Sequence, residues 1–285
     1  MSRLDAIELR PRREGILRVS YRLLSGTILD RLRRLEANSL ITNFTLLLAF
    51  RFGLLDLSIR LGVTFLLNVF VYFINDFIDV QIDLASGTKD RAKALYLQEH
   101  RRTAFALIAC GSAGLLLLTL FYSRSVCFGV VLALLTTFLY TDYFKNIPFL
   151  DIAGCFVWGI AMAWPAIPDF SWEGIRLVLL IGIFAACFEV VQCVKDFDSD
   201  RASGLRTTPV VLGIPKAFLI ARSLYVLSAI YTVLVLGQIQ GAALLLPILF
   251  STKQKAESYW LKLRLVFGAV WLLIMARLFF GGQIG

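Results

Sequence analysis

The sequence predicts an all-α membrane protein, a bundle of about nine transmembrane helices. Of the 285 residues, 58% are hydrophobic and only 17% are charged, which is too apolar for a soluble domain of this length. The apolar residues gather in runs, several of which approach the roughly 20 residues that a helix needs to cross a bilayer. These runs lack the period-two alternation of membrane β-strands, so helices are expected.

Nine apolar segments are expected along the chain, and we assign them to one polytopic domain, residues 39–285. The segments are residues 39–56, 57–75, 103–122, 125–142, 147–166, 174–194, 217–236, 239–251 and 260–280. Residues 1–38 form a separate basic segment with nine arginines. Its leucines and isoleucine, such as Leu23, Leu24 and Ile28, recur at helical spacing, which is typical of a helix at a membrane interface.

The distribution of positive charge predicts the orientation in the membrane. If the N-terminus is cytoplasmic, 24 of the 29 lysines and arginines fall on the cytoplasmic side. The loops after the second, fourth, sixth and eighth segments then share that side. Because membrane topology accounts for the net charge of +9, we expect a lipid bilayer as partner and no nucleic acid.

An acidic stretch, Asn75 to Asp83, directly follows the second apolar segment. Read as one continuing helix, it places Asn75, Asp79 and Asp83 on one face, with Asp76 beside them. Two unit charges about 4 Å apart repel by roughly 4 kcal/mol at an effective dielectric near 20. Such a row therefore needs a metal ion, basic partners or protons, and it is suited to a divalent cation.

A second acidic row follows the sixth segment and repeats the first. A shift of 117 residues superposes Asp79 on Asp196 and Asp83 on Asp200, and in both copies the sequence Ala-Ser-Gly follows after one residue. Each row comes after an even-numbered segment and precedes a basic loop that contains glycine. This predicts a repeated unit whose two acidic rows face each other across the bundle.

Basic residues near the two rows predict an anionic ligand between them. The candidates are Arg91, Lys93, Lys145, Lys195 and Arg201. Carboxylates hold Mg²⁺, which usually keeps positions for substrate phosphate, so a diphosphate fits this mixture of charges.

Asn68 and Tyr72 continue the polar face of Asp76 into the bilayer and predict a cavity below the acids. A ligand with a diphosphate head and a hydrocarbon tail would suit both halves.

The remaining metal-binding residue types give no competing site. Cys110, Cys127, Cys155, Cys187 and Cys193 all lie within expected segments without metal-ligand spacing, so we expect them to pack in the bundle. The single histidine, His100, excludes sites that need several histidines and is expected in a solvated loop.

With these two motifs the chain resembles the UbiA superfamily of membrane-embedded prenyltransferases. The stretch from Asn75 matches that family's N-D-x-x-D-x-x-x-D motif, and Asp196 to Asp200 match its second D-x-x-x-D motif. The second motif continues as D-R-x-x-G-x-x-T-x-P-x-x-x-G, which ends at Gly213. Many members carry Arg-Pro after the first motif, where this chain has Arg91-Ala92.

The resemblance implies nine helices around a central cavity, capped on the cytoplasmic side by the two Asp-rich loops. The cap would bind an isoprenyl diphosphate through Mg²⁺, with Asn75, Asp76, Asp79, Asp83, Asp196 and Asp200 as metal-site residues. It also implies that Lys145 contacts the diphosphate and that Tyr140 and Thr141 lie near the allylic carbon. The expected activity is Mg²⁺-dependent transfer of the prenyl group to an aromatic or lipid-precursor acceptor, with release of diphosphate.

Two alternatives remain at this point. A terpene cyclase would use the same ionisation of an isoprenyl diphosphate without an acceptor. A cation transporter could use the acidic rows as ion sites, but transporter sites usually lie near the bilayer midplane, and these acids gather at one face.

Overall fold

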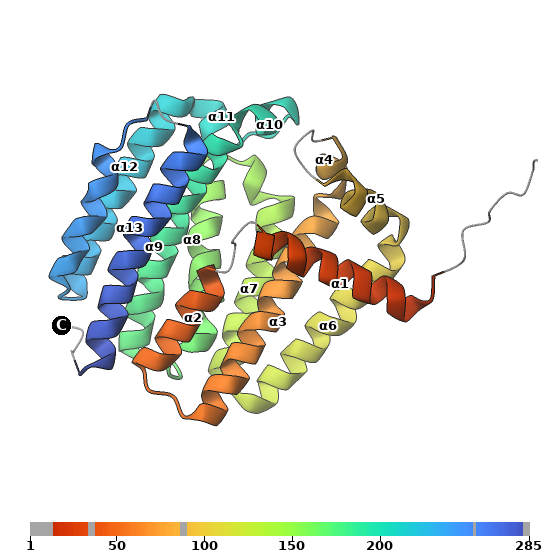
Figure 1. The fold of residues 1–285 in the computed structure, drawn as a ribbon, viewed down its shortest axis with the longest axis horizontal. Coiled ribbons are helices and arrows are strands. Elements are labelled where there is room, and N and C mark those ends of the chain that lie inside the picture. Colours follow the sequence, from red (N-terminus) through yellow and green to blue (C-terminus); the bar gives the residue numbers. More distant parts are fainter. Residues whose placement is uncertain (1–13, 34–37, 86–89, 253–254, 282–285) are drawn as a thin grey trace, which may run out of the picture.

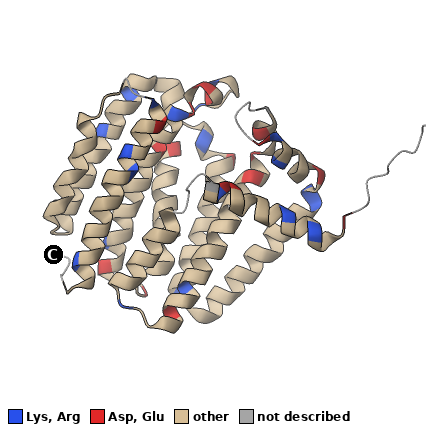
Figure 2. Cartoon of the chain, in the orientation of Figure 1, with Lys and Arg blue, Asp and Glu red and all other residues tan. Residues whose placement is uncertain are grey.

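The all-α prediction is confirmed. The computed structural model describes residues 14–33, 38–85, 90–252 and 255–281, and this part of the chain contains helices and no strand. The long helices stand side by side in a bundle, while the short helices α4, α5, α10 and α11 gather at one end of it (Figure 1). Most charged residues lie at that end and along α1, and the middle of the bundle carries few (Figure 2).

The nine expected segments all fall on helices. These are α2 (Asn38–Ala49), α3 (Leu54–Ile78), α6 (Arg101–Tyr122), α7 (Arg124–Asp142), α8 (Leu150–Ala163), α9 (Trp172–Lys195), α12 (Ile214–Ile230), the 3-10 helix η4 (Ile239–Leu249) and α13 (Ala256–Phe279). Short turns extend three of them, namely η1 (Phe144–Asn146), η2 (Trp164–Ala166) and the π-helical η3 (Tyr231–Val235).

Five of these elements are long and apolar enough to cross a membrane within the described residues. They are Leu54–Ile78, Arg101–Tyr122, Arg124–Asn146, Trp172–Lys195 and Ile214–Val235. Three apolar helices are shorter, Asn38–Ala49, Leu150–Ala166 and Ile239–Leu249. Length and composition therefore support an integral membrane protein, and nine transmembrane helices remain a prediction.

Glycines let α8 and α9 pack closely. A Cβ atom on Gly182 would lie 2.8 Å from the backbone oxygen of Phe156, and one on Gly159 would lie 2.6 Å from Cβ of Ala185. Both distances are shorter than non-bonded atoms tolerate, so larger side chains would push the helices apart. Small residues at such interfaces are a common means of packing helices in membranes.

A buried arginine holds the end of the bundle that lies away from α4 and α10. Arg60 on α3 is only 5% exposed, and its Nη1 donates to the carbonyl oxygens of Pro165 and Ile167 at 2.9 Å. Its Nη2 pairs with Asp169 at 3.0 Å. The guanidinium thus satisfies two backbone carbonyls of the turn that joins α8 to α9.

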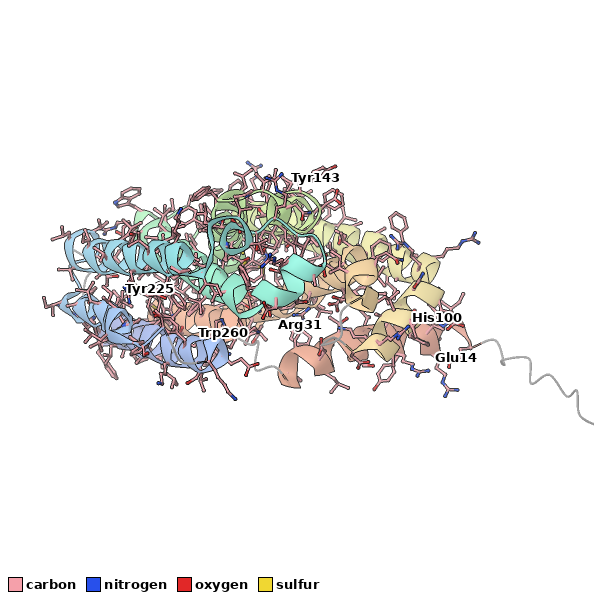
Figure 3. The ribbon with its side chains drawn as sticks, turned by 90° about the horizontal axis from the view of Figure 1, so that it is seen from above. Glu14, Arg31, His100, Tyr143, Tyr225 and Trp260 are labelled. Carbon is pink, nitrogen blue, oxygen red and sulfur yellow. The ribbon has the colours of Figure 1, made fainter. Side chains whose placement is uncertain are left out.

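The N-terminal segment forms a helix that lies across the bundle. In α1 (Ile16–Arg33), Val19 and Leu23 are buried in a cluster with Phe73 of α3 and Leu97 of α5 (Arg91–Glu99). Seen from above, Arg31 lies at the inner end of α1, toward the middle of the molecule, whereas Glu14 lies at the outer end (Figure 3). A helix with one buried face is present over Ile16–Arg33, and its place at a membrane interface stays a prediction. Residues 1–13 and 34–37 lie outside the described residues.

Candidate active site

The two acidic rows have the same local structure. Each long helix ends at the first aspartate, Asp79 after α3 and Asp196 after α9, where ψ is near zero. A six-residue helix follows, α4 (Val80–Ala85) or α10 (Phe197–Ala202), and its fourth residue is the second aspartate, Asp83 or Asp200. The 117-residue repeat is therefore present in the backbone as well as in the sequence.

The expectation of one continuous helix from Asn75 to Asp83 is wrong, because the helix is interrupted at Asp79, which forms a turn between α3 and α4. The interruption changes the backbone hydrogen bonds little. The amide of Asp79 still donates to the carbonyl oxygen of Asn75, and that of Asp83 to Asp79, both at 2.9 Å. The corresponding bond from Asp200 to Asp196 is 2.8 Å long. The two aspartates of each row therefore keep the spacing of one helical turn, while α4 and α10 start a new helix after the turn.

Lys145 joins the two rows. Its Nζ donates to Oδ2 of Asp79 at 2.7 Å, and it also interacts electrostatically with Asp83 and Asp200. Burial raises the pKa of Asp200 to about 6, the neighbouring Asp196 adds to the rise, and Lys145 opposes it. Lys145 of η1 thus forms an ion pair with the first row and interacts electrostatically with the second, while a shared ligand site between the rows stays a prediction.

Two carboxamides occupy equivalent positions one turn before the acidic rows. Asn75 Oδ1 lies 3.3 Å from Thr141 Oγ1, and Gln192 Nε2 donates to Asp196 Oδ2 at 2.6 Å. The shift of 117 residues that pairs the aspartates also pairs Asn75 with Gln192. Gln192 was missed as a site residue, although extending the repeat by one more turn would have found it.

Asp76 belongs to a different cluster from its neighbours in the motif. Its carboxylate accepts from Arg31 at 3.0 Å, from Lys93 at 2.7 Å and from Thr27 at 3.2 Å. Lys93 also pairs with Asp30 at 3.2 Å. The partners of Asp76 thus come from α1 and α5, whereas Lys145, the partner of Asp79, lies in η1 directly after α7. The structure therefore places Lys93, a predicted ligand of the substrate, in an ion-pair network with α1.

The other predicted basic residues lie at the edge of the site. Lys195 Nζ is 3.9 Å from Asp196 Oδ1 and 5.5 Å from the ring of Trp260. Arg91 is exposed at the first position of α5, and Arg201 is exposed in α10. Of the predicted cations, Lys145 is the one that the structure brings between the acidic rows.

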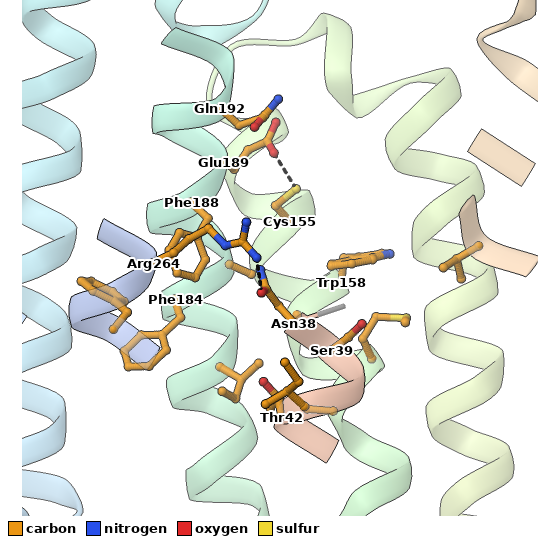
Figure 4. Close-up of a pocket in the computed structure, with 18 of the residues that line it drawn as sticks. Asn38, Ser39, Thr42, Cys155, Trp158, Phe184, Phe188, Glu189, Gln192 and Arg264 are labelled. Atoms are coloured by element: carbon orange, nitrogen blue, oxygen red, sulfur yellow. Dashed lines mark hydrogen bonds between the residues drawn. The ribbon is translucent and has the colours of Figure 1, made fainter. Parts of the chain in front are cut away.

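A cavity of about 560 Å³ lies inside the bundle next to the acidic rows. That size is typical of sites for small organic ligands. Figure 4 shows Gln192, Glu189 and Cys155 at one end of it and the rings of Phe184, Phe188 and Trp158 further along. The predicted cavity is therefore present, and its wall is mostly apolar, although Arg264, Asn38 and Ser39 add polar groups among the rings (Figure 4).

Of the two residues predicted to line the cavity, Tyr72 does so, and the guanidinium of Arg31, another lining residue, lies 4.2 Å from the centre of its ring. Asn75, Tyr140 and Thr141, which were predicted at the metal site or near the allylic carbon, also line the cavity. Asn68 is not among the lining residues. Its side chain donates to the carbonyl of Thr64 at 2.8 Å and accepts from Ser39, which itself faces the cavity.

Glu189 in the cavity wall was not predicted as a site residue. Tyr140 donates to its Oε1, as does Cys193 at 3.0 Å, while Cys155 donates to Oε2 at 3.2 Å. The two cysteines thus have polar contacts in addition to the packing role expected for them. A carboxylate inside an apolar segment, seven residues before Asp196, was the available signal.

The acidic rows offer the oxygen ligands that Mg²⁺ takes. Within the described part of the chain, no three His, Cys, Asp or Glu side chains gather closely enough to enclose a metal ion by themselves. This fits Mg²⁺, which is usually held by one or two carboxylates and completes its octahedron with water and substrate phosphate. Residues from both rows and the carboxamides of Asn75 and Gln192 supply such oxygens.

Fold and site together define a helical membrane protein with a paired acidic site above an apolar cavity. The sequence model of the UbiA prenyltransferase family matches residues 40–280, and the chain belongs to this family.

Two proteins named digeranylgeranylglyceryl phosphate synthase are similar to this chain over part of their length. The chain is 30% identical over 164 residues to the digeranylgeranylglyceryl phosphate synthase of Thermococcus gammatolerans, covering 52% of this chain and 54% of the relative. It is 28% identical over 172 residues to the protein of that name from Haloquadratum walsbyi, covering 56% and 57%. The chain thus spans about half the length of these relatives.

Solved structures share the fold. A UbiA homologue from Archaeoglobus fulgidus bound to GPP and Mg²⁺ superposes with a TM-score of 0.70 at 14% identity, covering 92% of this chain and 99% of that one. A structure described as digeranylgeranylglyceryl phosphate synthase in membranes gives 0.68 at 18% identity, covering 93% and 99%. The similarity extends along nearly the whole chain.

Proposed function

We propose that this protein transfers a prenyl group from an isoprenyl diphosphate to an acceptor within the membrane, with release of diphosphate. The observation that carries the proposal is the meeting of two acidic rows around Lys145 beside the apolar cavity. One end suits a metal-bound diphosphate and the other a hydrocarbon chain. Family membership and the Mg²⁺ and GPP bound by the Archaeoglobus homologue support the same donor and cofactor.

In this mechanism, Asp79, Asp83, Asp196 and Asp200, with the carboxamides of Asn75 and Gln192, hold the metal and its diphosphate. Bound Mg²⁺ supplies positive charge that stabilises the departing diphosphate. Lys145 adds a second positive charge at the same place and moves from Asp79 toward the phosphate oxygens. Tyr140 and Tyr72 line the adjoining cavity, where their ring faces stabilise positive charge at the allylic carbon.

The acceptor we favour is a polar lipid precursor, for which the named relatives give the reason. A digeranylgeranylglyceryl phosphate carries two prenyl chains, so its synthase would use a glyceryl phosphate that already carries one. An aromatic acceptor is the second candidate, because aromatic side chains such as Trp158 line the cavity. We place the site at the cytoplasmic face, following the distribution of positive charge.

The test is release of diphosphate by the purified full-length chain in lipid nanodiscs with Mg²⁺. Donors of several chain lengths are supplied with a monoprenylated glyceryl phosphate, with an aromatic acid, or alone. Acceptor-dependent release with a prenylated product supports transfer. Release with a cyclic hydrocarbon and no acceptor would identify a cyclase, and the absence of release together with ion flux into liposomes that contain the protein would identify a transporter.

The same assay tests the site. Asp79→Asn and Asp196→Asn should each reduce turnover by at least about 100-fold, because each removes a charged oxygen ligand from the metal-binding rows. Asp142→Asn, an exposed position at the end of α7, is the matched control and should keep the wild-type rate. Wild-type rates in both site variants would refute the assignment.

A further inference from the structure

Glu189 is a carboxyl group in the cavity wall to which the mechanism above gives no role. It lies on α9, one helical turn before Gln192 and two turns before Asp196. Shifted back by 117 residues it corresponds to Tyr72, and both side chains line the cavity. Glu189 therefore lies where the diphosphate end of the site meets the apolar part.

Glu189 has three hydrogen-bond partners that can donate to a carboxylate. They are the hydroxyl of Tyr140 and the thiols of Cys155 and Cys193, and together they engage both carboxylate oxygens. Within the described residues no lysine or arginine pairs with it. Burying a carboxylate among apolar helices costs several kcal/mol unless donors satisfy it. Three donors reduce that cost and leave a group that can accept a proton.

Among the described residues, the other acids near the cavity are already engaged elsewhere. Asp79 is paired with Lys145, Asp76 lies in the network with α1, and the acids of the second row are metal-site residues. Glu189, by contrast, lines the cavity, and its Oε2 accepts a hydrogen bond from Cys155, which lines the cavity too (Figure 4). A thiol is a weak donor, so an acceptor hydroxyl could replace it at little cost.

We propose that Glu189 is the base that takes the proton of the acceptor, an inference that rests on the proposed prenyl transfer. The allylic C1–O bond breaks, and its electron pair leaves with the diphosphate. The acceptor oxygen, or the ring carbon of an aromatic acceptor, forms the new bond to C1. The acceptor O–H or C–H bond breaks, and the proton moves to Oε2 of Glu189, from which water removes it after product release.

Tyr140 positions the base in this scheme. Its hydroxyl and the Cys193 thiol hold Oε1, which fixes the carboxylate plane and leaves Oε2 for the acceptor. Because Tyr140 stands five residues before Lys145, one segment holds both the base and the diphosphate. The titratable groups that face Glu189 are Tyr140, Cys155 and Cys193, and Asp151 and Asp200 interact with it electrostatically.

The experiment compares Glu189→Gln with Glu173→Gln, the same substitution at an exposed position in the first turn of α9. Full-length variants in nanodiscs receive Mg²⁺, geranylgeranyl diphosphate and the monoprenylated glyceryl phosphate. Products are separated into prenylated acceptor and prenyl alcohol, which forms when water captures the ionised donor. Loss of a general base should reduce acceptor prenylation by about 100-fold or more. The KM for donor should stay within about threefold, and the share of prenyl alcohol should rise; the control should match wild type.

Two results would overturn the assignment while leaving prenyl transfer intact. One is transfer by Glu189→Gln within about threefold of wild type. The other is a parallel fall of prenylated acceptor and prenyl alcohol, which would mean that Glu189 acts on the donor. A wild-type protein that releases no diphosphate with either acceptor class would overturn the proposed function as well.

If the Glu189→Gln variant fails to fold, Glu189→Asp provides the test. It keeps a carboxylate and retracts it by one methylene, so it should retain at least a tenth of the wild-type transfer with the wild-type product ratio. Complete loss of transfer by a Glu189→Asp protein that still binds donor with wild-type affinity would refute the role of base.

Discussion

Asp76 and Asp79 lie three residues apart in one motif, yet they have different partners. Asp79 contacts Lys145 beside the second acidic row, whereas Asp76 is held by Arg31 and Lys93. The resemblance to the family implied that both are metal-site residues, because both belong to its first motif. It could not predict the partners, which α1 and α5 bring from more than 15 residues away on either side. We propose that Asp76 docks α1 and does not bind the metal.

Asp76→Asn should therefore loosen α1 and spare the metal site. Hydrogen exchange of residues 16–33 should accelerate, because the amide removes the negative charge that pairs with Arg31 of α1 and Lys93 of α5. Calorimetric affinity for a non-reactive isoprenyl diphosphate analogue with Mg²⁺ should stay within about threefold of wild type. Loss of analogue binding with unchanged exchange in α1 would instead make Asp76 a metal ligand, as the motif predicted.

Sequence reasoning at this scale also missed Glu189, for a physical reason. Its three donors lie on α7, α8 and α9, so only the packed bundle shows that the carboxylate is satisfied. The aspartates could be predicted, because their spacing repeats along the chain and needs no tertiary information. Tyr72 lines the cavity as its spacing from Asp76 predicted, while Asn68 packs between α2 and α3 beside it.

Among the elements, the apolar segments were predicted well because hydrophobicity is a local property of the chain. The interruptions of the helix at Asp79 and Asp196 were not predicted, because helical residue spacing continues across both and the backbone hydrogen bonds change little. The close packing of α8 on α9 likewise depends on which glycines face each other. Neither helix shows in its own sequence that Gly159 and Gly182 lie at the interface.

Gly182→Ala tests that packing. A methyl group there would lie 2.8 Å from a backbone oxygen, which cannot turn aside as a side chain could. We expect α8 and α9 to separate slightly, at a cost of about 1–3 kcal/mol. Thermal unfolding in detergent should show a lower Tm. Gly114→Ala on α6, where a Cβ atom would meet no neighbour within 4 Å, is the control and should leave the Tm unchanged or raise it.

For the whole molecule, the proposed site joins parts of the chain that the bundle alone holds together. A ligand that bridges the rows should stabilise the fold against unfolding, because only the native state brings α4, α10 and η1 together. At an analogue concentration 100 times its Kd the gain would be about 2.7 kcal/mol.

The measurement is the Tm of the full-length chain with an unreactive isoprenyl diphosphate analogue, with Mg²⁺ or with EDTA. The Tm should rise with analogue and Mg²⁺ together and return to the ligand-free value in EDTA, since the carboxylates repel the diphosphate without metal. Asp196→Asn should abolish most of the rise. An equal rise in EDTA would show that the cations alone hold the diphosphate.

The duplicated break at Asp79 and Asp196 also limits what a part of this chain can do. Each copy carries one acidic row, and Lys145 comes from the stretch between them. A fragment that ends before Trp172 would keep the first row and Lys145 but lose the second row and Glu189. A fragment that begins there would have a row without its lysine. We expect neither fragment to catalyse the proposed transfer, because the proposed site exists only between the two copies.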